Sequence, residues 1–129
     1  MQAIQHTHHP VAHGAYYDDQ KPEALAYTKA FFTERIPKFF GYFERVLGSR
    51  EHLVGDRLTY VDLSIFFLLE GLRFSFPKRM KAAESAVPGL VALHDRVAAR
   101  PNIAAYQSSP RRMPFNDRGV FRHYPELDT

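Results

Sequence analysis

Four histidines near the amino terminus are the residues whose type and spacing come nearest to a chemical site. His6, His9 and His13 are three and four residues apart, so a helix would carry their imidazoles on one face, with His8 beside them. A structural zinc site needs four protein ligands, and a catalytic one needs three and a water molecule. No HExxH motif or carboxylate partner stands near these histidines. The sequence therefore favours a histidine face that borders a pocket, and we predict no metal ligand.

Asp62 is the carboxylate with the clearest local role. It follows Thr59 by three residues, at the start of a long apolar stretch. Thr59 can therefore act as a helix N-cap and Asp62 as the third residue of a capping box, with Leu58 and Leu63 closing a hydrophobic staple around it. Catalysis by Asp62 is the less favoured alternative, and we predict a structural cap formed by Thr59 and Asp62.

No other group of residues has a complete catalytic pattern. The carboxylate pairs Asp18–Asp19 and Glu126/Asp128 lie in polar segments that we expect to be exposed, whereas acid–base catalysis needs a perturbed carboxylate. The serines lack the glycine elbow of a GxSxG motif, and no glycine-rich phosphate loop is present. We therefore predict no catalytic residue in this chain.

Composition narrows the classes of function further. The 129 residues include no cysteine, which excludes disulfides, thiolate chemistry and cysteine zinc sites. The net charge of +3 is small, and the basic residues do not follow one stripe, so no nucleic-acid partner is expected. The apolar stretches are shorter than the about 20 residues that cross a bilayer, and no secretory signal opens the chain. We expect one cytoplasmic domain without a membrane partner.

A buried central helix is expected to organise the fold. The segment from residue 60 to residue 72 is apolar on nearly every side, which is typical of a helix covered all round. Before it, apolar residues recur at helical spacing from about Pro22 to Leu47, and Pro37 predicts a kink or a break there. Glu44 and Arg45 lie off this apolar stripe, so we expect them to be solvated.

Shorter helices are expected after the central one. Residues 78–84 can form a basic helix, Pro88 opens a helix that ends before Pro101, and Pro101 opens another. Residues 109–129 are rich in proline and read as an irregular tail held by three aromatic residues: Phe115, Phe121 and Tyr124. No stretch alternates with the period of a strand. The predicted fold is all-α: a compact orthogonal bundle of about five to six helices around a buried central helix, with an irregular C-terminal tail.

Three stretches together resemble a known family. They are RIPKFFGYFERVL (residues 35–47), LVGDRLTYVDLSIF (residues 53–66) and RPNIAAYQSSP (residues 100–110). In combination they are similar to the C-terminal helical domain of cytosolic glutathione transferases. The resemblance covers roughly residues 16–129, and it implies that residues 1–13 are the end of the first helix of that domain. Residues 1–129 would then be one helical domain with its tail at 109–129.

The resemblance implies a detoxifying enzyme of two domains. In this family a thioredoxin-like domain binds the co-substrate glutathione and activates its thiol, and the helical domain supplies much of the pocket for the electrophile. The sequence contains no match to the thioredoxin-like domain, so we expect the isolated chain to be inactive and to bind no cofactor. The expected partners are a thioredoxin-like domain or subunit and a second copy in a homodimer. By analogy, the substrate-binding residues would be His9, Tyr16, Tyr17 and Phe115.

A second hypothesis is a stand-alone helical module for protein interaction or assembly. Helical domains of this type resemble assembly domains that are appended to some translation factors and aminoacyl-tRNA synthetases. The surface that a thioredoxin-like domain would otherwise cover would then be an exposed apolar partner site. The sequence does not identify the electrophilic substrate or the oligomeric state.

Overall fold

The computed structural model describes residues 17–116 and 118–129, and these residues form helices and no strand. The helices are α2 (Lys21–Ala30), α3 (Ile36–Leu47), α4 (Tyr60–Ser75), α5 (Pro77–Glu84), α6 (Pro88–Ala98) and α7 (Pro101–Gln107). A π-helical turn, η2 (Phe31–Arg35), joins α2 to α3, and two 3-10 turns are η1 (Tyr17–Gln20) and η3 (Pro125–Leu127). The prediction of an all-α fold is confirmed.

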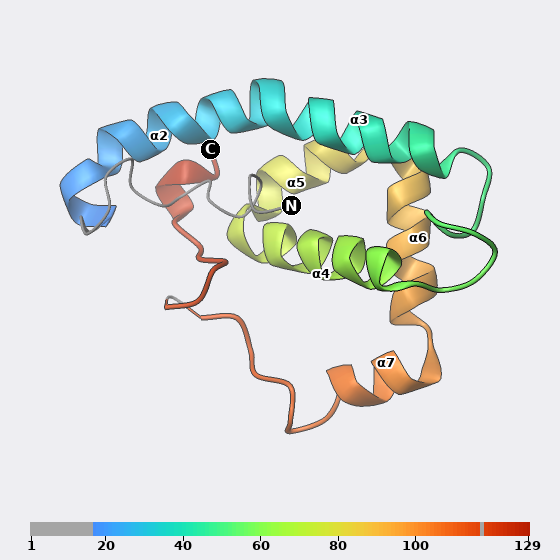
Figure 1. Cartoon of the computed structure of the whole chain (residues 1–129). Coiled ribbons are helices and arrows are strands. Elements are labelled where there is room, and N and C mark those ends of the chain that lie inside the picture. Colours follow the sequence, from blue (N-terminus) through green and yellow to red (C-terminus); the bar gives the residue numbers. More distant parts are fainter. Residues whose placement is uncertain (1–16, 117) are drawn as a thin grey trace.

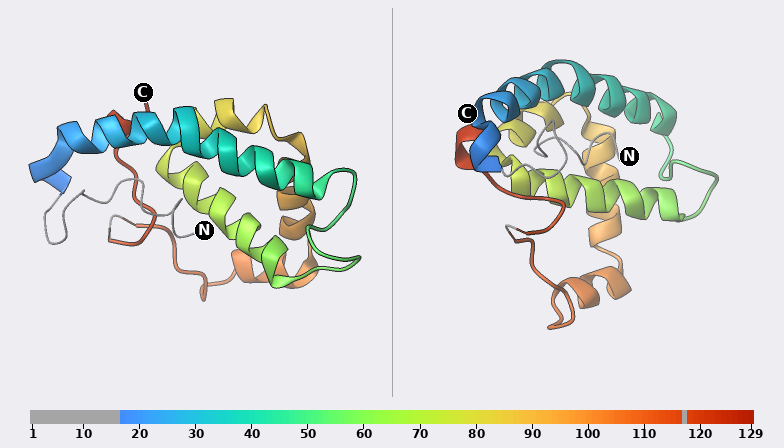
Figure 2. Two further views of the ribbon diagram at one scale, coloured as in Figure 1. Left: turned by 45° about the horizontal axis from the view of Figure 1, so that its top comes forward. Right: turned by 60° about the vertical axis from the view of Figure 1, so that its left-hand side comes forward.

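The helices pack around α4. Figure 1 shows α2 and α3 as one long curved helix above α4, with α6 running across the ends of α3 and α4. The two further views in Figure 2 agree that α6 crosses these helices steeply, and α6 packs against both of them. The long tail after α7 runs below α4 and returns, so that η3 packs against α2.

Helix α4 is the centre of the core, as its sequence predicts, but one of its faces is open. Leu68, Leu69 and Leu72 are almost fully buried. In contrast, Tyr60 is 80% exposed and Phe67 is 52% exposed. The expectation that no side of this helix meets solvent is therefore wrong along one aromatic face, because, among residues 17–116 and 118–129, no helix covers that face.

The capping box that the sequence predicts opens α4. Thr59 and Asp62 form both of its reciprocal contacts, and the Thr59 N–H donates to Asp62 Oδ2 over 2.8 Å. Asp62 is fully buried, and its second oxygen accepts the N–H of Leu53 over 2.9 Å. The carboxylate therefore ties the preceding loop to the helix start, and its bonds to both oxygens explain how it is buried without a catalytic role.

Of the kink or break predicted at Pro37, a break is absent (Figure 1), and the helix is irregular directly before the proline, at η2. In a regular α-helix the proline ring would collide with the carbonyl of residue 33. The π turn removes this conflict by widening the helix, and the N–H of Ile36 donates to the carbonyl of Phe31, five residues back. The helix therefore continues from α2 into α3, and Figure 1 shows it curving rather than breaking.

Glu44 is not solvated as expected, because it caps another helix. Its two carboxylate oxygens accept the N–H groups of Gly89 and Leu90 over 2.8 and 2.9 Å, at the start of α6. Helix α6 begins with a proline and its N-cap residue Val87 has no side-chain acceptor, so these N–H groups need a remote partner. Arg45, on the same turn, is exposed as expected.

Asp128 caps α5 in the same manner. It is 1% exposed, and its two oxygens accept the N–H groups of Lys78 and Arg79, both over 2.9 Å. The expectation that this carboxylate is exposed is wrong, because the tail folds back and delivers it to a helix start that lacks a cap of its own. The end of the tail is thereby fixed to the bundle.

None of the helices formed by residues 17–116 and 118–129 is both long and apolar enough to cross a lipid bilayer.

Candidate functional site

The exposed face of α4 and the tail form a cluster of aromatic rings, which we call the aromatic wall. It consists of Phe67 and Phe74 from α4 and Phe115 and Phe121 from the tail. The ring of Phe115 stacks on that of Phe74 with centroids 5.2 Å apart, and it lies 6.1 Å from Phe67 and 5.7 Å from Phe121. Phe67 and Phe121 meet edge to face at 5.6 Å. These distances lie within the range of favourable aromatic pairs.

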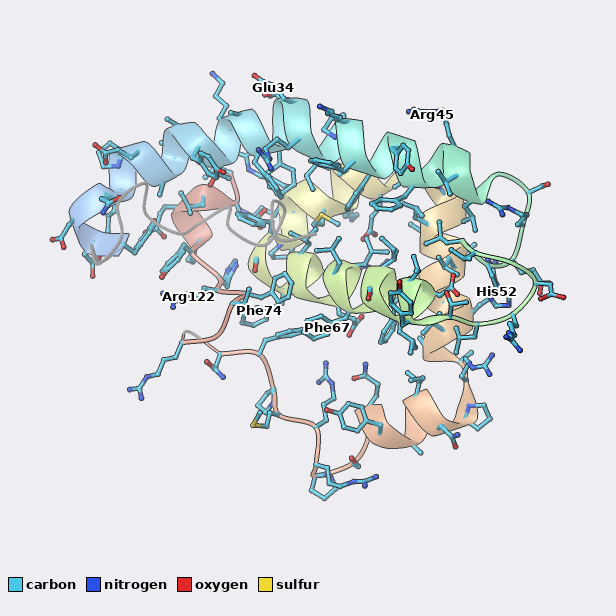
Figure 3. All side chains as sticks on the ribbon, in the orientation of Figure 1. Glu34, Arg45, His52, Phe67, Phe74 and Arg122 are labelled. Carbon is cyan, nitrogen blue, oxygen red and sulfur yellow. The ribbon has the colours of Figure 1, made fainter. Side chains whose placement is uncertain are left out.

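The spacing of residues on α4 positions this wall. Phe67 and Phe74 are seven residues apart, so two helical turns bring them to the same face. Figure 3 shows both labelled side chains on the side of α4 that faces the tail. Between them, Gly71 leaves room for the ring of Phe121, because a Cβ at this position would lie 2.4 Å from three of its ring atoms. The glycine therefore lets the tail approach the helix closely.

A cation and an exposed side chain border the wall. The guanidinium of Arg112 lies 5.8 Å from the centre of the Phe115 ring, and its Nη2 lies 3.6 Å from Glu70 Oε2. Met113, the next residue, is 86% exposed. Phe67 is half exposed and Phe74 and Phe115 are partly exposed, whereas Phe121 is buried, so the wall presents part of its aromatic surface to solvent. Such a surface can stack against a flat apolar molecule.

Tyr17 lies in a second aromatic contact. Its ring stacks on Tyr124 with centroids 3.7 Å apart, and its hydroxyl donates to Glu126 Oε1 over 2.9 Å. Burial, followed by the hydrogen bond to the Glu126 carboxylate, raises the pKa of the Tyr17 phenol well above its usual range. The phenol therefore stays protonated at neutral pH and is unsuited to act as a base.

The predicted substrate-binding residues have different outcomes. Phe115 lies in the aromatic wall. Tyr17 has Tyr124 as its stacking partner rather than a member of the wall. His9 and Tyr16 lie outside the residues that the structure describes, as do the other three histidines of the amino-terminal group. Binding of a substrate by any of these residues remains a prediction.

Phe67 and Phe74 were missed because their signal was ambiguous. Both belong to an apolar run that is read most simply as core. The one sign of an exposed face is Gly71, which weakens a helix unless another group approaches it closely.

A polar network between α4, α5 and α6 was also missed. His94 is 6% exposed, its Nε2 lies 2.8 Å from Glu70 Oε1, and its Nδ1 lies 3.0 Å from Asp95 Oδ1. Arg73 contacts the same ring and makes a two-pronged ion pair with Glu84, with distances of 2.6 and 3.2 Å. The network ties α4 to α5 and α6, so we assign it to packing of the bundle.

An apolar groove of about 610 Å³ lies between α3 and α5. Phe32, Ile36 and Phe40 line one side and Ala83 lines the other, with Lys78 at its edge. It offers mostly aliphatic surface, and it is the main rival to the aromatic wall as a place for an apolar ligand. In the described part of the chain, no three His, Asp or Glu side chains converge to hold a metal ion.

Comparison with known proteins identifies the family. Residues 5–110 match the family model for the glutathione S-transferase C-terminal domain. The chain is 31% identical over 113 residues to glutathione S-transferase Mu 3 of Mus musculus, an overlap of 88% of this chain and 45% of the relative. It is 34% identical over 86 residues to glutathione S-transferase Mu 1 of Bos taurus, covering 67% and 38% respectively.

A parasite protein shows a similar likeness. Glutathione S-transferase of Plasmodium yoelii yoelii is 35% identical over 78 residues, which cover 59% of this chain and 35% of that protein. The chain thus spans less than half the length of the relatives that it matches. Since the family model covers most of its residues and its fold is a helical bundle, the chain belongs to the glutathione S-transferase family and corresponds to the C-terminal helical domain.

Proposed function

We propose that this chain is the part of a glutathione transferase that binds the electrophilic co-substrate, and that the aromatic wall contacts that electrophile. The observation that supports the proposal most strongly is the exposure of Phe67 within a cluster of aromatic rings. A large apolar side chain left open among other rings marks a binding surface more often than a packing defect. The position of Phe115 in the same cluster agrees with the role that the family resemblance gave it.

The aromatic wall suits an aryl electrophile better than the groove between α3 and α5 does. Electron-poor rings stack on phenylalanine rings, and the half-exposed Phe67 beside the partly buried Phe115 allows such a contact without rearrangement of the core. The groove has the rings of Phe32 and Phe40 in its lining, but Phe40 is 3% exposed and the Arg79 guanidinium lies 5.4 Å from the centre of the Phe32 ring, so most of the contact that it offers is aliphatic. We therefore assign the electrophile to the wall.

The chemistry of conjugation needs groups beyond this chain. In the complete enzyme, glutathione is the co-substrate, and its thiolate attacks the electrophilic carbon while the leaving group departs. This sequence has no cysteine, and the hydroxyl of Tyr17 is committed to Glu126, so neither supplies a base for the thiol. We propose that a thioredoxin-like domain or subunit provides thiol activation, and that the assembled enzyme is a homodimer.

Equilibrium dialysis of the chain with 1-chloro-2,4-dinitrobenzene, without glutathione, tests the proposal. We expect saturable binding that Phe67→Ala weakens about tenfold, because truncation removes a stacked ring worth about 1–1.5 kcal/mol. Tyr42→Ala is the matched control, since Tyr42 is 53% exposed on α3 and is not part of the wall. It should leave the dissociation constant unchanged.

Two results would contradict the proposal. Equal effects of Phe67→Ala and Tyr42→Ala on the dissociation constant would show that binding does not involve the aromatic wall. Rapid conjugation of this aryl halide to glutathione by the 129-residue chain alone would show that the chain carries a complete active site.

A further inference from the structure

A pocket of about 400 Å³ lies between the loop before α4 and the end of α6, away from the aromatic wall. Its apolar lining comes from five residues: Leu58, Leu93, Val97, Ala99 and Pro101. Its polar lining consists of Glu51, His52, Arg96 and Arg100. The volume is at the lower end of the range for small-molecule sites, so the pocket suits a ligand about the size of one aromatic ring with a polar group.

The two arginines differ in how they are held. Arg96 donates from Nη2 to the backbone carbonyl of Glu51 over 2.8 Å, which fixes its guanidinium across the loop while leaving other N–H groups unused. The guanidinium of Arg100 has no hydrogen-bond or ion-pair partner within residues 17–116 and 118–129, where only its backbone is bonded. Two guanidinium groups that border one small pocket repel each other, and a bound anion would remove that repulsion.

His52 adds a third nitrogen-bearing group. Its side chain is only 16% exposed, and Nδ1 lies 3.7 Å from the buried carboxylate of Asp62 without making a hydrogen bond. Figure 3 shows His52 on the loop beside α6. The imidazole therefore lies between the cap of α4 and the pocket, on the same side as the arginines. Glu51 is the one carboxylate on the lining, so the lining carries a net positive charge with or without a proton on His52.

The carbonyl end of α6 favours cations in its last turn, and this accounts for a basic residue at that end. It does not account for an apolar floor below two arginines and a histidine. We propose that this pocket binds a small organic carboxylate, with its apolar body on Leu58 and Pro101, above the buried side chains of Leu93 and Val97, and its carboxylate between Arg96 and Arg100. Planar carboxylates match the fork of N–H donors on a guanidinium, so the charge and the shape both fit.

The pocket lies on a different set of elements from the aromatic wall, so the inference does not depend on the function proposed above. The test is an NMR titration of the full chain with benzoate, with benzamide as the neutral ligand of the same shape. We expect benzoate to shift the Leu93, Val97 and His52 signals saturably, and benzamide to bind at least about fivefold more weakly because it lacks the charge. Higher ionic strength should weaken benzoate binding as well, since the site is open to solvent.

Substitutions with opposite effects locate the site. Arg100→Gln should weaken benzoate binding about three- to fivefold, and Glu51→Gln should strengthen it by removing the one opposing charge. Arg45→Gln, an exposed arginine on α3 that Figure 3 shows pointing away from the bundle, is the control and should change nothing. Arg100, Glu51 and Arg45 are all exposed, so we expect the three variants to fold as the unmodified chain does.

The inference is overturned by any of three results. The first is a linear, non-saturable change in the signals with benzoate. The second is equal affinity for benzoate and benzamide, and the third is an affinity that Arg100→Gln leaves unaltered.

Discussion

Gly71 decides how closely the tail approaches the central helix. A Cβ at this position would overlap the Phe121 ring, which is 2% exposed and cannot move without leaving the core. We therefore expect Gly71→Ala to destabilise the fold by about 1–2 kcal/mol in urea unfolding, because overpacking outweighs the gain in helix propensity of about 1 kcal/mol.

Gly41→Ala is the matched control for that prediction. Gly41 lies within α3, and an added Cβ there would contact only the mobile end of the Arg45 side chain, at 3.4 Å. This substitution should leave stability unchanged or raise it, since its main effect is the higher helix propensity of alanine compared with glycine. If Gly71→Ala were as stable as Gly41→Ala, the close approach of the Phe121 ring would be disproved.

Tyr17 gives the fold a dependence on alkaline pH. Its pKa is raised in the folded chain, by burial and by Glu126, above the value of about 10 expected in the unfolded chain. Above that pH the native chain therefore binds more protons than the unfolded chain, and stability falls as pH rises. Tyr17→Phe should reduce this fall between about pH 9 and pH 11, measured by urea unfolding.

Tyr42→Phe is the reference for the alkaline measurement, because it removes a hydroxyl that is exposed on α3. The free energy of unfolding of this variant should fall with pH as steeply as that of the unmodified chain. The free energy of unfolding of Tyr17→Phe could instead fall with pH as steeply as in the unmodified chain and in Tyr42→Phe. That result would mean that the hydrogen bond to Glu126 does not hold the Tyr17 proton.

Among the elements, the starts of α5 and α6 depend on carboxylates that are remote in the sequence. Both helices begin with proline and lack a side-chain cap of their own. Glu44→Gln should cost about 1–2 kcal/mol in urea unfolding, because it replaces charge-assisted bonds to two N–H groups and removes a favourable charge at a helix start.

Glu34→Gln is the matched control for the cap of α6. Glu34 is exposed in the turn before α3, and Figure 3 shows it pointing to solvent, so its substitution should change stability by less than about 0.5 kcal/mol. Equal losses in the two variants would contradict the capping role of Glu44.

These elements show how far the sequence could predict the structure. The cap of α4 was predictable because Thr59 and Asp62 are three residues apart, within one helical turn. The caps of α5 and α6 were not, because Asp128 and Glu44 reach them across about 50 and 45 residues of chain. The irregularity at Pro37 was predictable, but its form was not, because a π turn has no clear local signal and removes the conflict without breaking the helix.

The candidate site was predictable only in part, for a similar reason. Phe115 was named through the family resemblance and lies in the aromatic wall. Phe67 was read as core, since an apolar run on one helix does not show which face the rest of the chain will leave open. That face is set by where the tail returns, which depends on Gly71 and on the buried anchor at Asp128.

At the scale of the whole molecule, the chain is a helical bundle with one aromatic surface formed between its central helix and its tail. The polar network around His94 links α4 to α5 and α6, and the tail is anchored at its far end by Asp128. The chain covers 35–45% of the length of the three relatives described above. A rigid bundle with an open wall fits a domain that presents a surface to a co-substrate held elsewhere.

The most direct test of this account is to map where an aryl electrophile binds. Aromatic and methyl NMR signals of the chain should be followed during titration with 1-chloro-2,4-dinitrobenzene. We predict that the signals of Phe67, Phe74 and Phe115 shift saturably, while those of Ile36 and Ala83 in the groove between α3 and α5 stay in place. Shifts confined to Ile36 and Ala83, with the three phenylalanine rings unchanged, would contradict the account.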